Sequence, residues 1–147
     1  MPENTYNILT EGVGGRDAER LTAVLNEYAG AMSGDLAFSI DPETVSADAT
    51  AAAWTRTVTI SLVDSSGNVQ KWFNKAITSG VSIGDTSSAG TASIASTTLT
   101  FVNGVATVVV SGDEAAWLAE ETDTLTIAQA TILGYTVAAK TSVETFA

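Results

Sequence analysis

Apolar residues recur at helical spacing in one early stretch of the chain. Between residues 15 and 32 they are separated by three, four, three and four positions, which places them on one face of a helix. The members of this stripe are Ala18, Leu21, Leu25, Tyr28 and Met32. Asp17 suits the first turn and Gly34 can end the helix in a left-handed cap. The pattern predicts one amphipathic helix.

This helix has one apolar and one polar face, and two interpretations are possible for what covers the apolar face. It could dock on the rest of the same chain. It could instead be an anchor that seats the protein on a partner or joins a small bundle, since two heptads are too short for a stable coiled coil alone. Its candidate partner-binding residues are Leu21, Leu25, Tyr28 and Met32.

From Asp35 onward the apolar residues alternate with polar ones, which is typical of strands with one buried face. The first expected strand carries apolar residues at alternate positions, Leu36, Phe38 and Ile40, and ends at Asp41-Pro42. The clearest strand then follows, with Thr and Ser on its outer face and one apolar face made of Trp54, Arg56, Val58, Ile60 and Leu62. We expect Arg56, the exception on that face, to lie at the open end of the strand.

Turn signals divide the remaining sequence into short segments. Residues 64–68 predict a turn from which 69–73 returns as a strand, and Asn103-Gly104 predicts a tight hairpin. One helical turn is expected over 113–120, with Trp117 and Leu118 folded inward. The other expected strands are 77–83, 90–94, 98–102, 105–110, 124–128, 132–137 and 142–146.

Seven or eight short strands behind a single helix predict a mainly β protein. We expect an immunoglobulin-like antiparallel Greek-key β-sandwich preceded by the N-terminal amphipathic α-helix. The predicted parts are an arm and helix over 1–34, for attachment or docking, and the sandwich over 35–147. The helix is not interleaved with the strands, which disfavours a βαβ architecture.

Composition narrows the possible functions. The chain has no cysteine and no histidine, which excludes thiolate sites, a Ser-His-Asp triad and histidine-based zinc sites. A formal charge of −11 opposes binding to nucleic acid or to anionic membranes. No apolar run approaches the roughly 20 residues of a transmembrane helix, and residues 1–10 lack the features of a signal peptide.

Only carboxylates are numerous enough to suggest catalysis or calcium binding. We expect the acidic cluster at 120–123 to be a solvated loop and 64–68 to be a plain turn, because it lacks the alternating carboxylates of a calcium loop. The glycines at 12–15 precede no P-loop lysine and are interpreted as a hinge. The sequence therefore predicts no catalytic residues, no metal and no cofactor.

Trp72 and Phe73 are the remaining candidates for a partner contact. Neighbours on a strand face opposite sides, so one of the two must leave the core unless something covers it. A subunit contact could cover it, and so could the N-terminal helix. We expect Trp54 and Trp117 to pack in the core.

The span 58–127 resembles the bacterial immunoglobulin-like modules of invasin and intimin adhesins, which recur in virion proteins of tailed phages. The matching stretches are Val58 to Asn68, which is like the family's strand-Asp-x-x-Gly-Asn turn, and Phe101 to Val108, which is like its strand-x-Gly-x-Ala-x-Val hairpin. Asp123 to Ile127 looks like a late strand of such modules. Two aromatics at 72–73 replace the family's usual small residues, and one module stands in place of a tandem array.

The layout of a short N-terminal element before one sandwich looks more like a phage head-decoration or head-fibre protein. The resemblance implies a non-enzymatic virion protein on the capsid exterior, made in the host cytoplasm without a signal peptide. Its partner would be a capsid or other virion protein, and the helical stripe would suit a homotrimer. The alternative is an adhesin-like module that binds a host-surface glycan or receptor through the Trp72-Phe73 strand and loops such as 84–90.

Overall fold

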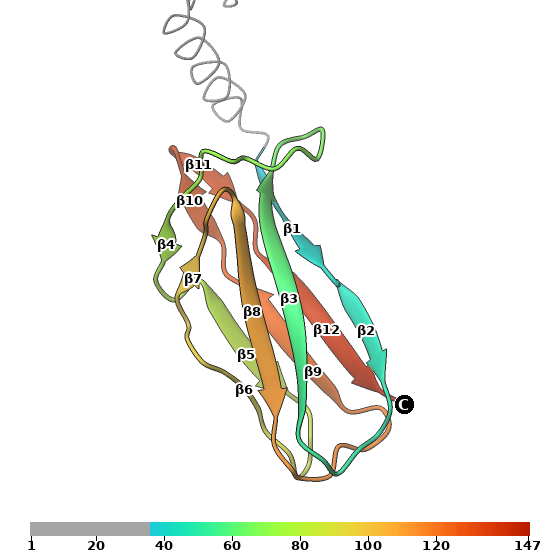
Figure 1. The fold of residues 1–147 in the computed structure, drawn as a ribbon. Helices are drawn as coiled ribbons and strands as arrows, with labels where there is room; N and C mark the ends of the chain where they lie inside the picture. The colour runs from blue at the N-terminus through green and yellow to red at the C-terminus, as the bar shows by residue number, and fades with distance from the viewer. Residues whose placement is uncertain (1–35) are drawn as a thin grey trace, which may run out of the picture.

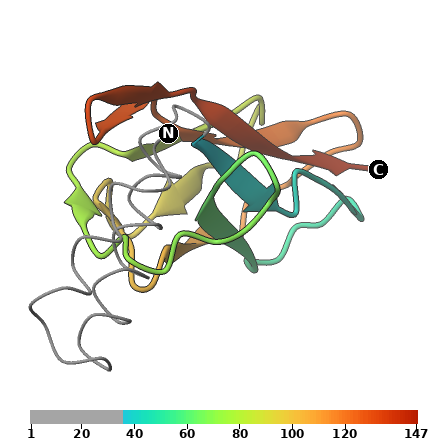
Figure 2. The same ribbon diagram turned by 90° about the horizontal axis from the view of Figure 1, so that it is seen from above.

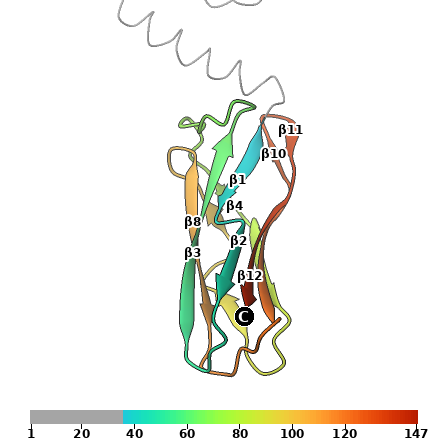
Figure 3. The ribbon, with the colours of Figure 1, turned by 90° about the vertical axis from the view of Figure 1, so that its right-hand side faces the viewer.

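Residues 36–147 are described by the computed structural model, and they form two four-stranded β-sheets packed face to face as a β-sandwich (Figure 1). The first sheet has the order β1 (Ala37–Asp41), β3 (Trp54–Val63), β8 (Val105–Gly112) and β6 (Ala92–Ile94). The second has the order β2 (Thr44–Ala47), β12 (Lys140–Phe146), β9 (Thr122–Ile127) and β5 (Val81–Asp85). Figure 3 shows the two layers from the side.

Two small strand pairs complete the described part of the chain. β4 (Ala76–Ile77) pairs with β7 (Leu99–Thr100), and β10 (Ala130–Ile132) pairs with β11 (Tyr135–Val137). The mainly β prediction is confirmed, and no helix occurs within 36–147. The predicted helix over residues 15–32 lies outside the described residues. No helix in the described part is long and apolar enough to cross a membrane.

The chain changes sheets at Asp41-Pro42, whose peptide bond is cis. β1 ends there as an antiparallel neighbour of β3, and β2 continues in the other sheet as a parallel neighbour of β12. Proline cannot donate to a β ladder, which explains why β1 stops at this point. The prediction of a wholly antiparallel sandwich is therefore wrong at one edge, because the chain keeps its direction when it crosses between the sheets.

The core follows the alternation of the longest strand. Val58, Ile60 and Leu62 point inward from β3 and are fully buried, as the sequence predicted. Aromatic side chains form two clusters within this core. Phe73 and Phe101 lie 5.0 Å apart between ring centroids in one cluster, and Trp117 and Phe146 lie 5.0 Å apart in the other.

Two predicted turns have the expected geometry. The Asp64 carboxylate accepts hydrogen bonds from the backbone N–H groups of Ser66 and Asn68, which lowers the pKa of Asp64. Asn103 and Gly104 have φ angles of 51° and 78°, the double positive φ that a type I′ hairpin requires.

Several local predictions are wrong. Residues 69–73 form turns and a single bridge in place of a strand, and 77–83 is split by a turn between β4 and β5. Residues 132–137 belong to the β10–β11 hairpin, where Leu133 and Gly134 take positive φ. Residues 113–120 contain no helical turn, and while Trp117 is buried, Leu118 points outward with 53% of its surface exposed.

The outward faces of both sheets carry small and hydroxylated side chains. β3 presents Thr55, Thr57 and Thr59, and β9 presents Thr122, Thr124 and Thr126. Within the eight strands of the two sheets, the exposed charged residues are Asp41, Asp85 and Lys140, and each stands at an end of its strand. The charge of the sandwich is therefore concentrated in its connections and at its ends.

The Asn103-Gly104 hairpin yields a stability prediction. In Gly104→Ala, a new Cβ would lie 2.5 Å from the carbonyl oxygen of Gln70, in addition to the strain of a positive φ. We expect a loss of about 2 kcal/mol or more in the free energy of unfolding, measured by urea denaturation. Gly67→Ala is the matched control, because Gly67 has φ of 82° but open space around its Cβ position, so only about 1 kcal/mol should be lost. Equal losses in the two variants would contradict the close approach to Gln70.

Candidate functional site

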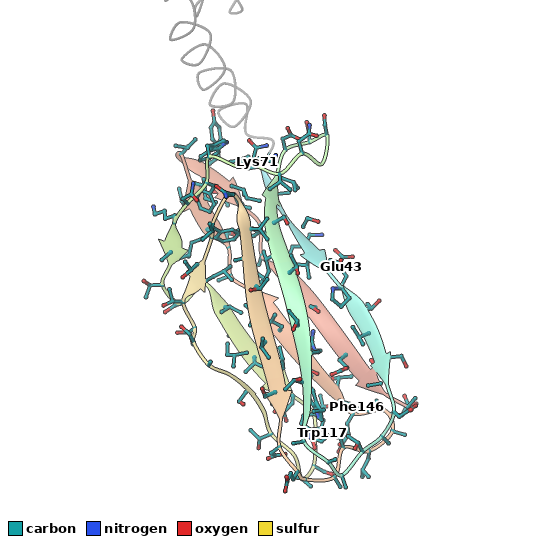
Figure 4. All side chains as sticks on the ribbon, viewed as in Figure 1. Glu43, Lys71, Trp117 and Phe146 are labelled. Carbon is teal, nitrogen blue, oxygen red and sulfur yellow. The ribbon has the colours of Figure 1, made fainter. Side chains whose placement is uncertain are left out.

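The two ends of the sandwich differ in structure. The near end consists of the start of β1 at Ala37, the connections 64–75 and 101–104, and the β10–β11 hairpin (Figure 1). The far end consists of the connections 48–53, 86–91 and 113–121. Figure 4 marks the two ends, with Lys71 at the near end and Trp117 and Phe146 at the far end.

A groove opens at the near end between residues 72–78 and the β10–β11 hairpin. It consists of two adjoining hollows of about 260 and 220 Å³, and Phe73, Lys75 and Ile132 line both of them. Figure 2 looks onto this end of the molecule, where the two segments lie beside each other. We call it the near-end groove, and its other lining residues are Trp72, Asn74, Ala76, Ile77, Thr78, Ala130, Thr131 and Leu133.

Trp72 and Phe73 both belong to this groove, although the strand predicted to carry them is absent. Phe73 is 4% exposed and packs on Phe101, while Trp72 is partly buried with its ring 5.7 Å from that of Phe73. The Trp72 indole N–H donates to the side-chain oxygen of Gln70 at 2.9 Å. The turn thus lets both rings pack against the body of the sandwich, so neither has to leave it.

The other four sequence-predicted partner-binding residues, Leu21, Leu25, Tyr28 and Met32, lie outside the described residues. The glycan alternative combined the Trp72-Phe73 segment with the loop at 84–90. The structure places these two parts at opposite ends of the sandwich, since the loop packs beside Trp117. They do not form one contact surface.

Charge also separates the two ends. The far end carries Asp85, the last residue of β5, and five further acidic residues in its connections. It contains no lysine or arginine, so its formal charge is −6. Those five are Asp48, Asp113, Glu114, Glu120 and Glu121. The connections of the near end carry Asp64 against Lys71 and Lys75, a formal charge of +1. The groove therefore lies at the less acidic end of an acidic molecule.

A cluster of charged residues joins the two sheets inside the core. Arg56 of β3 pairs with Asp123 of β9 through its Nε and Nη2 atoms, with the Nε to Oδ1 distance at 3.0 Å. Its Nη1 donates to the Ser142 hydroxyl of β12 at 2.9 Å, and that hydroxyl donates to the Pro42 carbonyl. Arg56 is not at an open strand end, as we had expected, because these partners hold its guanidinium inside the sandwich.

Glu144 of β12 is the third charged member of this cluster. One of its carboxylate oxygens, Oε2, lies 3.6 Å from Arg56 Nε but has no hydrogen-bond partner. Burial, and then the neighbouring Asp123 carboxylate, raise the pKa of Glu144 to about 7, while Arg56 acts in the opposite direction. One guanidinium cannot neutralise two ionised carboxylates, so this part of the core is sensitive to pH.

The cluster is closed to a substrate. Asp123 has no exposed surface and Glu144 is 5% exposed, so neither carboxylate can reach a molecule in solvent without opening the sandwich. The geometry is that of a buried link between sheets.

The predicted solvated loop at 120–123 is wrong at Asp123, while Glu121 stays partly exposed. Asp123 is buried in the cluster, and Glu121 accepts hydrogen bonds from the backbone N–H groups of Leu118 and Ser88, which lower its pKa to about 2. Alternation could have shown that Asp123 points inward, because it shares the parity of Leu125 and Ile127. Within residues 36–147, no group of three or more acidic side chains is arranged to hold a metal ion.

Comparison with known proteins adds no relative. No protein-family model matches this chain, and no curated protein sequence matches it significantly.

The buried cluster predicts how stability depends on pH. With its pKa raised from 4.5 to about 7, Glu144 binds more protons in the folded than in the unfolded chain over that interval. Its contribution to the free energy of unfolding is therefore largest below pH 4.5 and is lost as the pH rises to about 7. Glu144→Gln should remove this slope and stabilise the protein by about 2 kcal/mol at pH 8, measured by urea denaturation. Glu120→Gln, which removes an exposed carboxylate, is the control, and an unchanged slope in Glu144→Gln would contradict this role.

Proposed function

We propose that this chain is a non-enzymatic structural protein of a virion. It decorates or projects from the exterior of a phage capsid and is attached through its N-terminal segment, residues 1–34. The partner is a capsid or other virion protein, and the sandwich is the projecting part.

We further propose that the sandwich is immunoglobulin-like. In that fold, strands A, B, E and D form one sheet and strands C, F and G form the other. The order β1-β3-β8-β6 corresponds to A-B-E-D, and β5-β9-β12 corresponds to C-F-G. β2 adds to the edge of the second sheet after the crossing at Asp41-Pro42. This correspondence supports the resemblance of residues 58–127 to adhesin and phage modules.

The observation that carries the proposal is the position at which the chain joins the sandwich. β1 begins at one end of the long axis of the strands, the end at which β10 and β11 lie, and the acidic loops lie at the opposite end (Figures 1 and 3). An attachment through residues 1–34 would therefore hold the sandwich by its near end and direct its −6 far end away from the particle. This layout suits a projection that must stay soluble at its outer end.

Full-length variants test the attachment. Leu21→Asp combined with Leu25→Asp places two charges on the apolar stripe, and Thr22→Asp combined with Asn26→Asp places the same charges on the polar face. We expect the first pair to reduce binding to virions at least tenfold and the second to leave it unchanged. The measurement is the amount of tagged protein that sediments with DNA-filled particles, in lysates of cells producing the phage that encodes it.

Two results would count against the proposal. Unmodified protein that never sediments with particles would exclude a virion role. Equal sedimentation of both double variants with the particles would exclude attachment through the stripe. Circular dichroism of each variant establishes that the sandwich has kept its fold.

A further inference from the structure

The near-end groove presents apolar surface that no other part of residues 36–147 covers. Phe73 and Ile132 form its buried wall, while Leu133 at the tip of the β10–β11 hairpin is 44% exposed. Val102, in the neighbouring hairpin at the same end, is 61% exposed. Two of the four exposed large apolar side chains, Val102 and Leu133, thus lie at the near end, while Val109 lies on β8 and Leu118 at the far end.

We infer that this groove is the docking site for residues 15–32 of the same chain, which bind it through Leu21, Leu25, Tyr28 and Met32. The described structure begins at Leu36, which is buried at this end of the sandwich. Met32 is four residues earlier, and four residues span at most about 14 Å. The last residue of the stripe is therefore held within reach of the near end.

The length of the segment also limits where it can bind. As the helix that the sequence predicts, 18 residues extend about 27 Å. β3 alone contains 10 residues and is about 33 Å long, so the helix is shorter than the long axis of the sandwich and its C-terminal part stays at the near end.

Charge favours the near end over the rest of the molecule. Residues 1–35 contain six acidic residues against Arg16 and Arg20, a formal charge of −4. The connections of the near end carry +1, and Lys75 lines both hollows of the groove, whereas the far end carries −6. Within this stretch, residues 15–32 carry a formal charge of −1, so the segment is attracted only weakly to the near end but is repelled by the far-end loops.

The tether favours the chain's own segment over that of a second copy. Two copies that each carry a charge of −11 repel one another, whereas a short link gives the internal segment an effective concentration in the millimolar range. Self-docking covers the stripe in the isolated protein. If the proposed function holds, the stripe must leave the groove before it can bind a particle. The groove and the particle then compete for the same apolar residues.

Cysteine pairs test the docking in the full chain, since the protein contains no cysteine of its own. Tyr28→Cys is combined with Leu133→Cys or with Thr78→Cys, two positions that line the groove. The matched control combines Tyr28→Cys with Ser66→Cys, an exposed position at the near end outside the groove. A second control, Asn26→Cys with Leu133→Cys, places the thiol on the polar face of the helix. Disulfide formation under mild oxidation is followed on non-reducing gels.

We expect at least one groove pair to form an intramolecular disulfide ten or more times faster than both controls. Equal rates in all pairs would show random collision and overturn the inference, and so would the absence of a bond in both groove pairs. A disulfide-linked dimer would assign the groove to a second copy and would also overturn it. No particle is needed, so failure here is distinguishable from failure of virion attachment.

Discussion

The ion pair between Arg56 and Asp123 ties together the two sheets on which every other feature of the structure depends. A guanidinium inside a protein requires a partner, because an unpaired buried charge costs several kcal/mol. Arg56 comes from β3, in the first sheet, and finds its partners on β9 and β12, in the second. Apolar contacts can be made at several relative positions of the two sheets, whereas the ion pair between Arg56 and Asp123 can form at only one. The ion pair therefore fixes the position of one sheet on the other.

The same cluster leaves an electrostatic imbalance. Asp123 is satisfied by Arg56, but Glu144 shares that guanidinium at a longer distance and has an oxygen without a hydrogen bond. Burial, and then the neighbouring Asp123 carboxylate, favour the protonated form of Glu144, which is the reason for its raised pKa. The core is thus held most firmly when it is electrically neutral.

The sequence predicted the long elements of the fold, because period-two alternation is a local signal. β1 and β3 follow from it directly, and the double positive φ of Asn103-Gly104 follows from the identity of those two residues. Strands of two or three residues, such as β4 and β10, contain too few positions for a period to be seen. The turn that replaces a strand at 69–73 depends on bonds such as that from the Phe73 N–H to the Gln70 carbonyl.

The groove and the charged cluster depend on pairs of residues that are distant in sequence. Arg56 was recognisable as an exception on an apolar face, but Asp123 is 67 residues away and nothing local connects them. Likewise Phe73 and Ile132 share a hollow only because the β10–β11 hairpin folds back toward residues 72–78. Single-sequence patterns identified Trp72 and Phe73 as candidates for a contact, and the tertiary structure supplied the surface around them.

The hydroxylated faces of the two sheets have a consequence for the response to salt. Interactions between exposed charges are damped within about 8–10 Å at physiological ionic strength, while contacts between neutral hydroxyl groups are almost indifferent to it. Because nine of the twelve charged residues of 36–147 outside the buried cluster lie at the ends, added salt mainly alters how the ends of neighbouring molecules influence one another. Their broad sides respond less, so the mutual repulsion of the −11 chains at low salt acts mainly between the ends.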